Sequence, residues 1–180
     1  QICNALSYIH TRRDNRGKPL ELIHRDISPQ NIMFSADGVV KVMDFGVAKG
    51  KPIATSKQKT LAGKLNYTAP EIALFQEVDH RADIYSLGVV FYELVTGRLP
   101  FHWKDALQMN LNIEHSDFEP PSKYASYLPE EVERIILKAM AKEPKNRWAD
   151  AATMGFALNR YLYSKGLLLN ERSLSDYLKG

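Results

Sequence analysis

Apolar residues recur at helical spacing in the first and the middle parts of the chain. They lie three or four positions apart over 2–10, and this spacing predicts a helix there. Residues 81–96 are apolar on nearly all faces, which is typical of a helix buried in the middle of a domain, and Gly97 is a suitable end for it. The pattern therefore predicts one helix at the beginning and a more hydrophobic one near the centre.

Two further helices are predicted in the second half of the chain. Residues 129–144 carry one apolar stripe and predict an amphipathic helix that Pro144 ends. This stripe consists of Val132, Ile135, Ile136, Ala139 and Met140. The second helix is predicted over 149–164. Its inward face is expected to hold Met154, Ala157, Leu158 and Tyr161.

After the first helix, the helical spacing of apolar residues stops. Residues 11–19 are polar and contain Gly17 and Pro19, so we expect an exposed loop. Two short apolar runs, 31–34 and 39–45, are then separated by a turn with an Asp-Gly pair, which is a strong hairpin signal. Taken with the helices, these runs predict a mainly α fold with a small β-hairpin.

Residues 47–66 fit neither pattern. They have little apolar periodicity and many Lys, Thr and Ser residues, which indicates a long mobile segment. Structureless segments of this length are uncommon inside compact domains and are usually functional.

Composition narrows the class of protein. The chain has 180 residues, enough for one domain with a real core, and its 44% hydrophobic and 25% charged residues are ordinary for a soluble protein. The net charge of +3 is spread among acids, so we expect no nucleic-acid partner. The single cysteine, Cys3, excludes an internal disulfide and a Cys-based zinc site, and we expect it to be buried. No apolar run approaches the roughly 20 residues that a membrane helix needs, so we expect no membrane segment within this chain and a cytoplasmic location.

Three polar residues suggest phosphoryl-transfer chemistry. This reaction needs an aimed acceptor hydroxyl, a group that takes its proton, and neutralisation of the phosphate charge. Asp26 and Asn31 offer a carboxylate and an amide oxygen from one short loop. Asp44 offers a further carboxylate oxygen, the kind of ligand that Mg²⁺ prefers.

The motifs around these residues resemble those of protein kinases. "HRDISPQN" resembles the catalytic loop, "DFG" at 44–46 the metal loop, and "APE" at 69–71 the end of the activation segment. The order is that of the family, and the resemblance covers essentially the whole chain. It implies that Asp26 is catalytic, and that ATP and Mg²⁺ (or Mn²⁺) are cofactors bound through Asn31 and Asp44.

The resemblance also implies roles for packing residues. Met33 resembles the residue beneath the adenine of ATP, and His24 and Phe45 resemble members of a hydrophobic spine. In the central helix, Asp83 stands where the family has an aspartate that holds the catalytic-loop backbone. Likewise, Arg147 matches the arginine that pairs with the glutamate of "APE", here Glu71.

Some features of a whole kinase domain are missing from the sequence. No glycine-rich phosphate loop occurs, and neither does the family's ATP-pairing lysine with its partner glutamate. Both belong to the N-terminal lobe, which would precede residue 1. We therefore expect the C-terminal lobe of a two-lobed α+β domain over 1–165, with 166–180 as an extension or the end of the domain. By itself this lobe is expected to be inactive.

The chain departs from the family pattern at two positions. Serine/threonine kinases usually have a lysine two residues after the catalytic aspartate and a threonine seven residues before the glutamate of "APE". Here the first position holds Ser28 and the second Lys64. We expect a swap, in which Lys64 brings its ammonium to the phosphate and Ser28 supplies the hydroxyl. The alternative is that Lys64 is one more solvated lysine of a basic loop and that Ser28 simply precedes a turn.

Regulation by phosphorylation is a further expectation. Arg25 precedes the catalytic aspartate, and a buried or half-buried arginine there requires an anion. Thr60, eleven residues before Glu71, most resembles the family's regulatory threonine, and Lys49 is placed to help bind its phosphate. Thr55 and Ser56 are weaker candidates within the same segment.

The resemblance implies a protein serine/threonine kinase, reminiscent of bacterial members, with a protein substrate. Two other classes remain open. One is a pseudokinase or docking module that binds partner proteins without phosphoryl transfer, which Ser28 mildly favours. The other is a small-molecule phosphotransferase, a class that lacks the "APE" segment and the pattern around Asp83.

Overall fold

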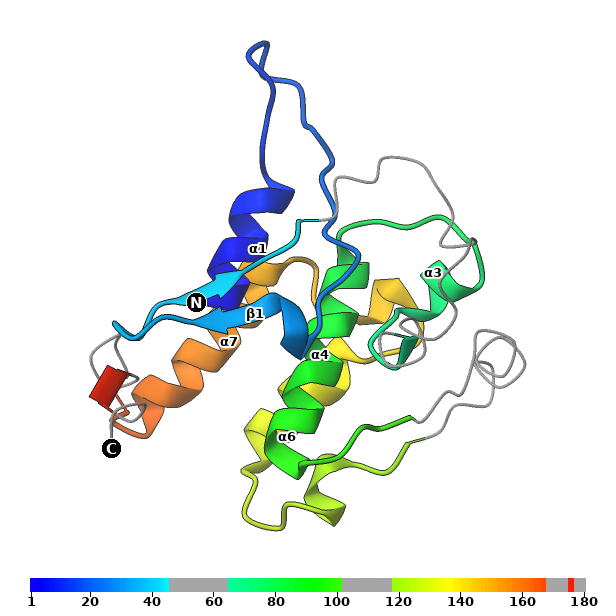
Figure 1. The fold of residues 1–180 in the computed structure, drawn as a ribbon. Helices are drawn as coiled ribbons and strands as arrows, with labels where there is room; N and C mark the ends of the chain where they lie inside the picture. Colours follow the sequence, from blue (N-terminus) through cyan, green and yellow to red (C-terminus); the bar gives the residue numbers. More distant parts are fainter. Residues whose placement is uncertain (46–64, 102–117, 168–174, 177–180) are drawn as a thin grey trace.

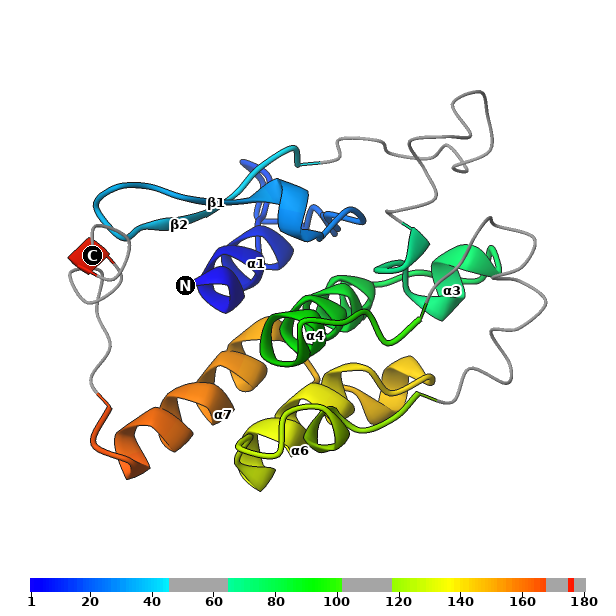
Figure 2. The same ribbon diagram turned by 60° about the horizontal axis from the view of Figure 1, so that its bottom comes forward.

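The fold is built around one buried helix. This computed structural model describes residues 1–45, 65–101, 118–167 and 175–176. Helix α4 (Arg81–Thr96) lies at the centre and packs against α6 (Glu130–Ala139). Helix α1 (Ile2–His10) packs against α7 (Ala151–Ser164) and against the β-hairpin. Figures 1 and 2 show the hairpin beside α1 and, on the other side of α4, α6.

Short elements complete the described part of the chain. The helix α3 (Pro70–Ala73) precedes α4 and was not expected from periodicity. Three single turns of 3₁₀ helix also occur: η1 (Pro29–Asn31), η3 (Pro121–Lys123) and η4 (Pro144–Asn146). All four short elements have a proline at their first positions, where its fixed φ angle and missing N–H are favourable.

Helix α4 confirms the expectation for 81–96. It is buried along most of its length, and Gly97 ends it in the left-handed conformation, with φ +66°. Gly88 allows the close approach of α6 to α4. A methyl group at Gly88 would lie 2.8 Å from Cγ of Met140 and 2.9 Å from Cβ of Ala139. The absence of a side chain at Gly88 therefore sets the spacing of these two helices.

Helix α6 is shorter than its pattern predicts. Its apolar stripe is buried as expected except for Val132, which is partly buried, but the helix ends at Ala139, with Met140 as its C-terminal cap, and does not continue to Pro144. The reason is a tertiary contact. The carbonyl oxygens of Ala141 and Lys142 accept hydrogen bonds from the guanidinium of Arg147, at 2.7 and 2.8 Å. This fixes the chain after Met140 in a non-helical turn.

Helix α7 confirms the last predicted helix and begins at a capping box. The side chain of Asp150 accepts from the backbone N–H of Thr153, and the side chain of Thr153 accepts from the backbone N–H of Asp150. Gly155 faces α1, where an added Cβ would lie 2.9 Å from Cβ of Cys3. Cys3 is buried as expected, and burial raises the pKa of its thiol to about 11.

The β-hairpin is also confirmed. Strands β1 (Ile32–Phe34) and β2 (Val40–Val42) pair antiparallel, with Met33 opposite Lys41. Gly38 in the connecting turn has φ +81°, a conformation that favours glycine. The residues after α1 form the expected exposed loop, which projects from the body in Figure 1. The described fold is therefore mainly helical with one small hairpin, as the sequence predicts.

Two findings concern membranes and the end of the chain. Within the described ranges, no helix has the length and apolar character needed to cross a bilayer.

Ser175 is buried, and its hydroxyl donates a 2.7 Å hydrogen bond to the carbonyl oxygen of Ala36 in the hairpin turn. The described residues near the end of the sequence thus contact the hairpin.

Candidate active site

The carboxylate of Asp83 holds the beginning of the loop that contains Asp26. Asp83 lies in the first turn of α4 and is completely buried. Its Oδ2 accepts from the backbone N–H of His24 at 2.8 Å, and its Oδ1 accepts from that of Arg25 at 2.7 Å. Nε2 of His10, from α1, lies 2.8 Å from Oδ2. The expected contact between Asp83 and the loop backbone is therefore present, and α1 contributes a third partner that the sequence did not indicate.

The His24 ring links this loop to the segment that carries Asp44. Its Nε2 lies 2.9 Å from the carbonyl oxygen of Met43, which can only accept, so Nε2 carries the proton. Nδ1 then accepts from the backbone N–H of Asp26, at 3.3 Å. The ring of Phe45 meets that of His24 edge-on, with centroids 5.4 Å apart. His24 is thus a packing residue that fixes two loops relative to each other.

Asn31 and Asp26 are joined directly. Nδ2 of Asn31 donates to the main-chain oxygen of Asp26 at 2.7 Å and to its carboxylate Oδ2 at 2.9 Å. Both amide hydrogens are used, so the orientation of the buried Asn31 side chain is fixed. Its Oδ1 accepts no hydrogen bond from any residue that the structure describes. Asn31 therefore presents a carbonyl-type oxygen from a rigid amide.

Asp44 is brought to the same place by the backbone. The N–H of Met43, the preceding residue, donates to the carbonyl oxygen of Asn31 at 2.8 Å. Asp44 itself is exposed and has φ +51°, and Arg25 has φ +65°. Left-handed backbone at a residue other than glycine costs about 1–3 kcal/mol and is common at functional sites. The loop with Asp26 and Asn31 and the turn with Asp44 therefore meet, and both contain a strained residue.

Ser28 has an unusual environment. Its side chain is 1% exposed, and its hydroxyl has no hydrogen-bond partner among the described residues. A buried hydroxyl without a partner costs about 1–3 kcal/mol. The position that departs from the kinase pattern is therefore one of two, with Nδ1 of His10, where a buried polar atom has no partner in the described parts of the chain.

The predicted pair of Glu71 and Arg147 is present and buried. Nη1 of Arg147 lies 2.6 Å from Oε1 of Glu71, and Nη2 lies 2.8 Å from Oε2. The other N–H groups donate to three carbonyl oxygens, those of Ala141, Lys142 and Arg81. All five donors of the guanidinium thus have a partner. Glu71 lies in α3 and Arg147 follows η4, so the pair joins two distant parts of the chain.

Arg25 differs from its expectation, and Met33 is open to solvent. The Arg25 side chain is exposed rather than buried or half-buried, while its backbone is held by Asp83 in a left-handed conformation. Met33 in β1 is 50% exposed. Four further candidates lie outside the described residues: Lys49, Thr55, Ser56 and Thr60. Lys64 lies outside them as well.

Sequence reasoning missed two polar contacts beside the site. One is His10, which lies in the last turn of the helix predicted over 2–10 and which no motif marked as functional. The other is Tyr67, just before the "APE" motif. Its hydroxyl donates to Oε2 of Glu93 in α4 at 2.5 Å, and burial and this carboxylate raise the pKa of Tyr67. Tyr67 therefore connects the residues before α3 to the central helix.

The arrangement provides oxygen ligands but no compact metal cluster. In the parts of the chain that the structure describes, no group of three or more His, Cys, Asp or Glu side chains is placed to hold an ion. The oxygens on offer come from an amide and from carboxylates on adjoining loops. Such a sparse set is typical of Mg²⁺ sites that keep several waters and take further ligands from substrate phosphates.

Comparison with known sequences agrees with this arrangement. Residues 1–157 match the protein kinase domain family, and the chain belongs to that family. It is 38% identical to the tyrosine-protein kinase MasK of Myxococcus xanthus over 177 residues, which are 98% of this chain and 27% of MasK. It is 40% identical to the serine/threonine-protein kinase PknB of Mycobacterium leprae over 154 residues, 84% of this chain and 24% of PknB.

The chain thus spans about a quarter of the length of these curated relatives. Because they are bacterial, they confirm the resemblance to the bacterial branch of the kinase family. The match to the kinase family agrees with the helix-rich fold and its single small hairpin.

Proposed function

We propose that this chain is the catalytic lobe of an ATP-dependent protein kinase that transfers the γ-phosphate to a hydroxyl group of a protein substrate. One observation carries the proposal. The Asn31 amide is bonded twice to Asp26, while the Asn31 backbone holds the residue before Asp44. This brings a carboxylate, an oriented amide oxygen and a second carboxylate to one place on a rigid scaffold.

Asp26 is the proposed acceptor of the substrate's proton. Its carboxylate is half-buried and is held at one oxygen by Nδ2 of Asn31. Its backbone is held by the His24 ring. A carboxylate fixed in this way aims a substrate hydroxyl and takes its proton as the phosphorus–oxygen bond forms.

Asn31 and Asp44 are the proposed ligands of Mg²⁺ or Mn²⁺. The fit rests on the fixed amide, whose Oδ1 no described residue occupies, and on the exposed Asp44 carboxylate. The bound metal would neutralise charge on the ATP phosphates. The side chain of Met33 stands on the open face of the hairpin, where it would lie beneath the adenine ring.

The serine-lysine swap is part of the proposal. The buried Ser28 hydroxyl lacks a partner among the described residues, and an ammonium group from Lys64 would supply one while reaching the transferred phosphate. We expect Lys64→Met to lower turnover strongly, whereas Lys59→Met, in the same basic segment, should change it little. Full turnover by the Lys64→Met protein would mean that Lys64 is only a solvated side chain.

The proposed substrate hydroxyl is that of serine or threonine. The segment with Tyr67 before "APE" resembles the serine/threonine pattern, while the relatives' names include both classes. Mass spectrometry of phosphorylated protein distinguishes the classes, since it locates each phosphate on a serine, threonine or tyrosine. Phosphate on tyrosine alone would reverse this assignment.

Regulation through the activation segment is also proposed. An exposed Arg25 is accessible to a phosphate on Thr60, with Lys49 as a second cation. We expect a phosphate on Thr60 in active protein, and lower activity in the Thr60→Ala variant. Active protein without any phosphate over 49–64 would rule this switch out.

Three further proposals concern the lobe as a whole. We propose a cytoplasmic location for this lobe, where ATP is available. Residues 1–165 would form the lobe, with 166–180 as its extension. We also propose that these 180 residues alone do not transfer phosphate, since they contain no glycine-rich loop to cover the ATP phosphates.

The test of the proposal is phosphoryl transfer by the full-length protein that contains this chain. It would be incubated with γ-labelled ATP, Mg²⁺ and a general protein substrate, and the label would be followed into protein. Asp44→Ala should abolish labelling. Labelling of small alcohols instead of protein would indicate a small-molecule phosphotransferase. No labelling with any acceptor would indicate a pseudokinase that binds partners.

A further inference from the structure

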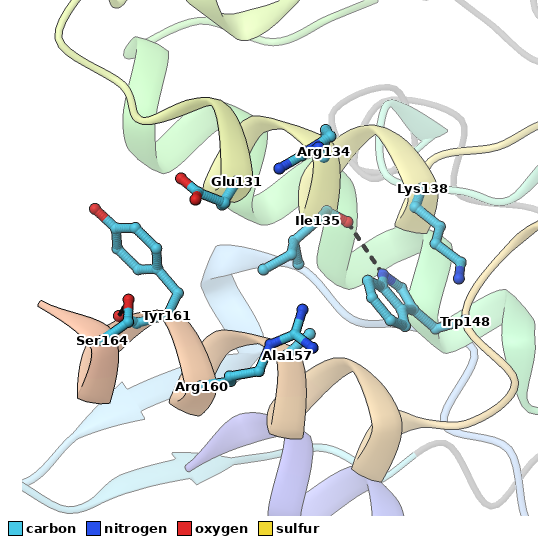
Figure 3. Close-up of a pocket in the computed structure, with 9 residues that line it drawn as sticks. All are labelled: Glu131, Arg134, Ile135, Lys138, Trp148, Ala157, Arg160, Tyr161 and Ser164. Carbon is cyan, nitrogen blue, oxygen red and sulfur yellow. Dashed lines mark hydrogen bonds between the residues drawn. The ribbon is translucent and has the colours of Figure 1, made fainter.

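A groove between α6 and α7 lies on a different part of the lobe from the site around Asp26. Figure 3 shows its walls, with α6 on one side and α7 on the other. The lining residues are Glu131, Arg134, Ile135, Lys138, Trp148, Ala157, Arg160, Tyr161 and Ser164. Ile135 and Ala157 are buried and form an apolar floor, and Trp148 and Tyr161 add aromatic surface.

The groove carries an excess of positive charge. Arg134 and Lys138 come from α6 and Arg160 from α7, while Glu131 is the only carboxylate among the described lining residues, so these side chains sum to +2, three cations less one anion. Arg160 extends from α7 towards α6 in Figure 3. Such a concentration of charge stands out on a chain whose total is only +3.

These cations are only weakly engaged with the protein. Arg134 lies 3.8 Å from Glu130, and both of these side chains are mostly exposed. Lys138 lies 4.1 Å above the Trp148 ring, a cation–π contact, and has no ion pair within the described ranges. Arg160 has no ion pair with any residue that the structure describes. The groove therefore combines accessible cations with apolar and aromatic surface.

We propose that this groove is a docking site for an acidic peptide segment of a partner protein. Charge complementarity identifies the occupant, and the helix geometry sets its spacing. Arg134 and Lys138 are four positions apart on α6, a rise of about 6 Å. Side chains on one face of an extended peptide are two residues, or about 6.6 Å, apart. The groove thus fits a peptide in which acidic residues alternate with other residues, with an apolar group on the floor.

The site differs from the proposed active site in residues and in ligand. It requires neither ATP nor metal, so binding there can be measured without phosphoryl transfer. The inference therefore stands or falls independently of the proposed kinase activity.

The experiment is fluorescence anisotropy with the full-length protein and a fluorescein-labelled octapeptide in which glutamate alternates with valine. We expect saturable binding that weakens with added salt, and none for a peptide with glutamine in place of glutamate. The double variant K138E/R160E should bind at least about tenfold more weakly, since each reversal turns an attraction into a repulsion. E131Q should bind more tightly, because it removes the opposing charge.

The matched control is R16E/K18E, which makes the same change in net charge on the exposed loop after α1. It should bind like the wild-type protein. If both double variants lose binding equally, the attraction is that of the overall charge and the proposal is wrong. It is also wrong if the peptide does not bind, or if K138E/R160E binds it normally.

Two further measurements make the result unambiguous. The milder variant K138Q/R160Q should keep the wild-type unfolding temperature and still lose affinity, which excludes misfolding as the cause. Vesicles of phosphatidylcholine with phosphatidylserine test the other source of negative charge. Binding to these vesicles through the same groove residues, without binding to the peptide, would assign the groove to a lipid surface and overturn the proposal.

Discussion

The buried pair of Glu71 and Arg147 is expected to be a major contributor to the stability of this lobe. Its side chains are 3% and 0% exposed, and the guanidinium also donates to three main-chain oxygens. Arg147→Met keeps much of the side-chain volume but removes every donor. It leaves the Glu71 carboxylate buried without a counter-charge and the carbonyl oxygens of Ala141 and Lys142 without this partner.

The magnitude follows from those losses. Removing one partner of a buried ion pair costs about 3–5 kcal/mol. For a domain of this size each kcal/mol lowers the unfolding temperature by roughly 2–4 °C. Arg147→Met should therefore lower that temperature by about 6–20 °C. The unfolding temperature of the Arg147→Lys protein should lie between those of the Arg147→Met and wild-type proteins. An ammonium group keeps the charge but cannot bind both carboxylate oxygens as the guanidinium does.

Calorimetric unfolding of the full-length protein measures this effect. Lys123→Met is the matched control, because Lys123 pairs with Glu119 at the surface and both side chains are about half exposed. It should leave the unfolding temperature unchanged. The double variant Glu71→Gln/Arg147→Met should lose less stability than the sum of the losses in the two single variants, since glutamine leaves no buried charge without a partner. An Arg147→Met protein as stable as the Lys123→Met protein would refute this reasoning.

Three other predictions concern single contacts around α4. Asp83→Asn replaces one of the two acceptor oxygens with a donor. We expect the unfolding free energy from urea titration to fall by about 1–3 kcal/mol and the turnover number to fall as well. If neither value changed, the role of Asp83 would be contradicted. Gly88→Ala should destabilise the lobe in the same titration, since the new methyl would overlap Met140, and an equally stable variant would show that α6 can shift freely. Tyr67→Phe should leave Glu93 without its donor and lower the unfolding temperature slightly, whereas a rise would mean that their hydrogen bond is not stabilising.

Much of the fold could be predicted from local pattern. The apolar faces of α4 and the Gly97 stop are properties of one segment, and so are the Asp-Gly turn and the start of α7 near Asp150. The end of α6 could not be predicted in this way. Its apolar stripe continues to Met140, but the backbone beyond it turns to meet Arg147, which reaches it from η4 only after the chain has folded.

In the site, too, some features could be predicted from the sequence and others depend on tertiary contacts. Motif order placed Asp26, Asn31 and Asp44 together, and their backbone connections agree with it. The contact between His10 and Asp83 spans 73 positions and that between Tyr67 and Glu93 spans 26, so neither follows from local spacing. Exposure of a side chain is also a tertiary property. For that reason the sequence suggested a buried or half-buried Arg25, whereas its side chain is exposed.

The most direct test of the central claim is the rate of phosphoryl transfer by the full-length protein with Asp26→Asn. The new amide retains an oxygen that can accept from Asn31, so the loop should keep its shape while losing the group that takes the proton. We expect the turnover number to fall by about 10²–10⁴. Asp37→Asn, the same chemical change in the exposed hairpin turn, should leave it unchanged. Equal turnover by the Asp26→Asn and wild-type proteins would contradict the assignment of this site as the catalytic centre.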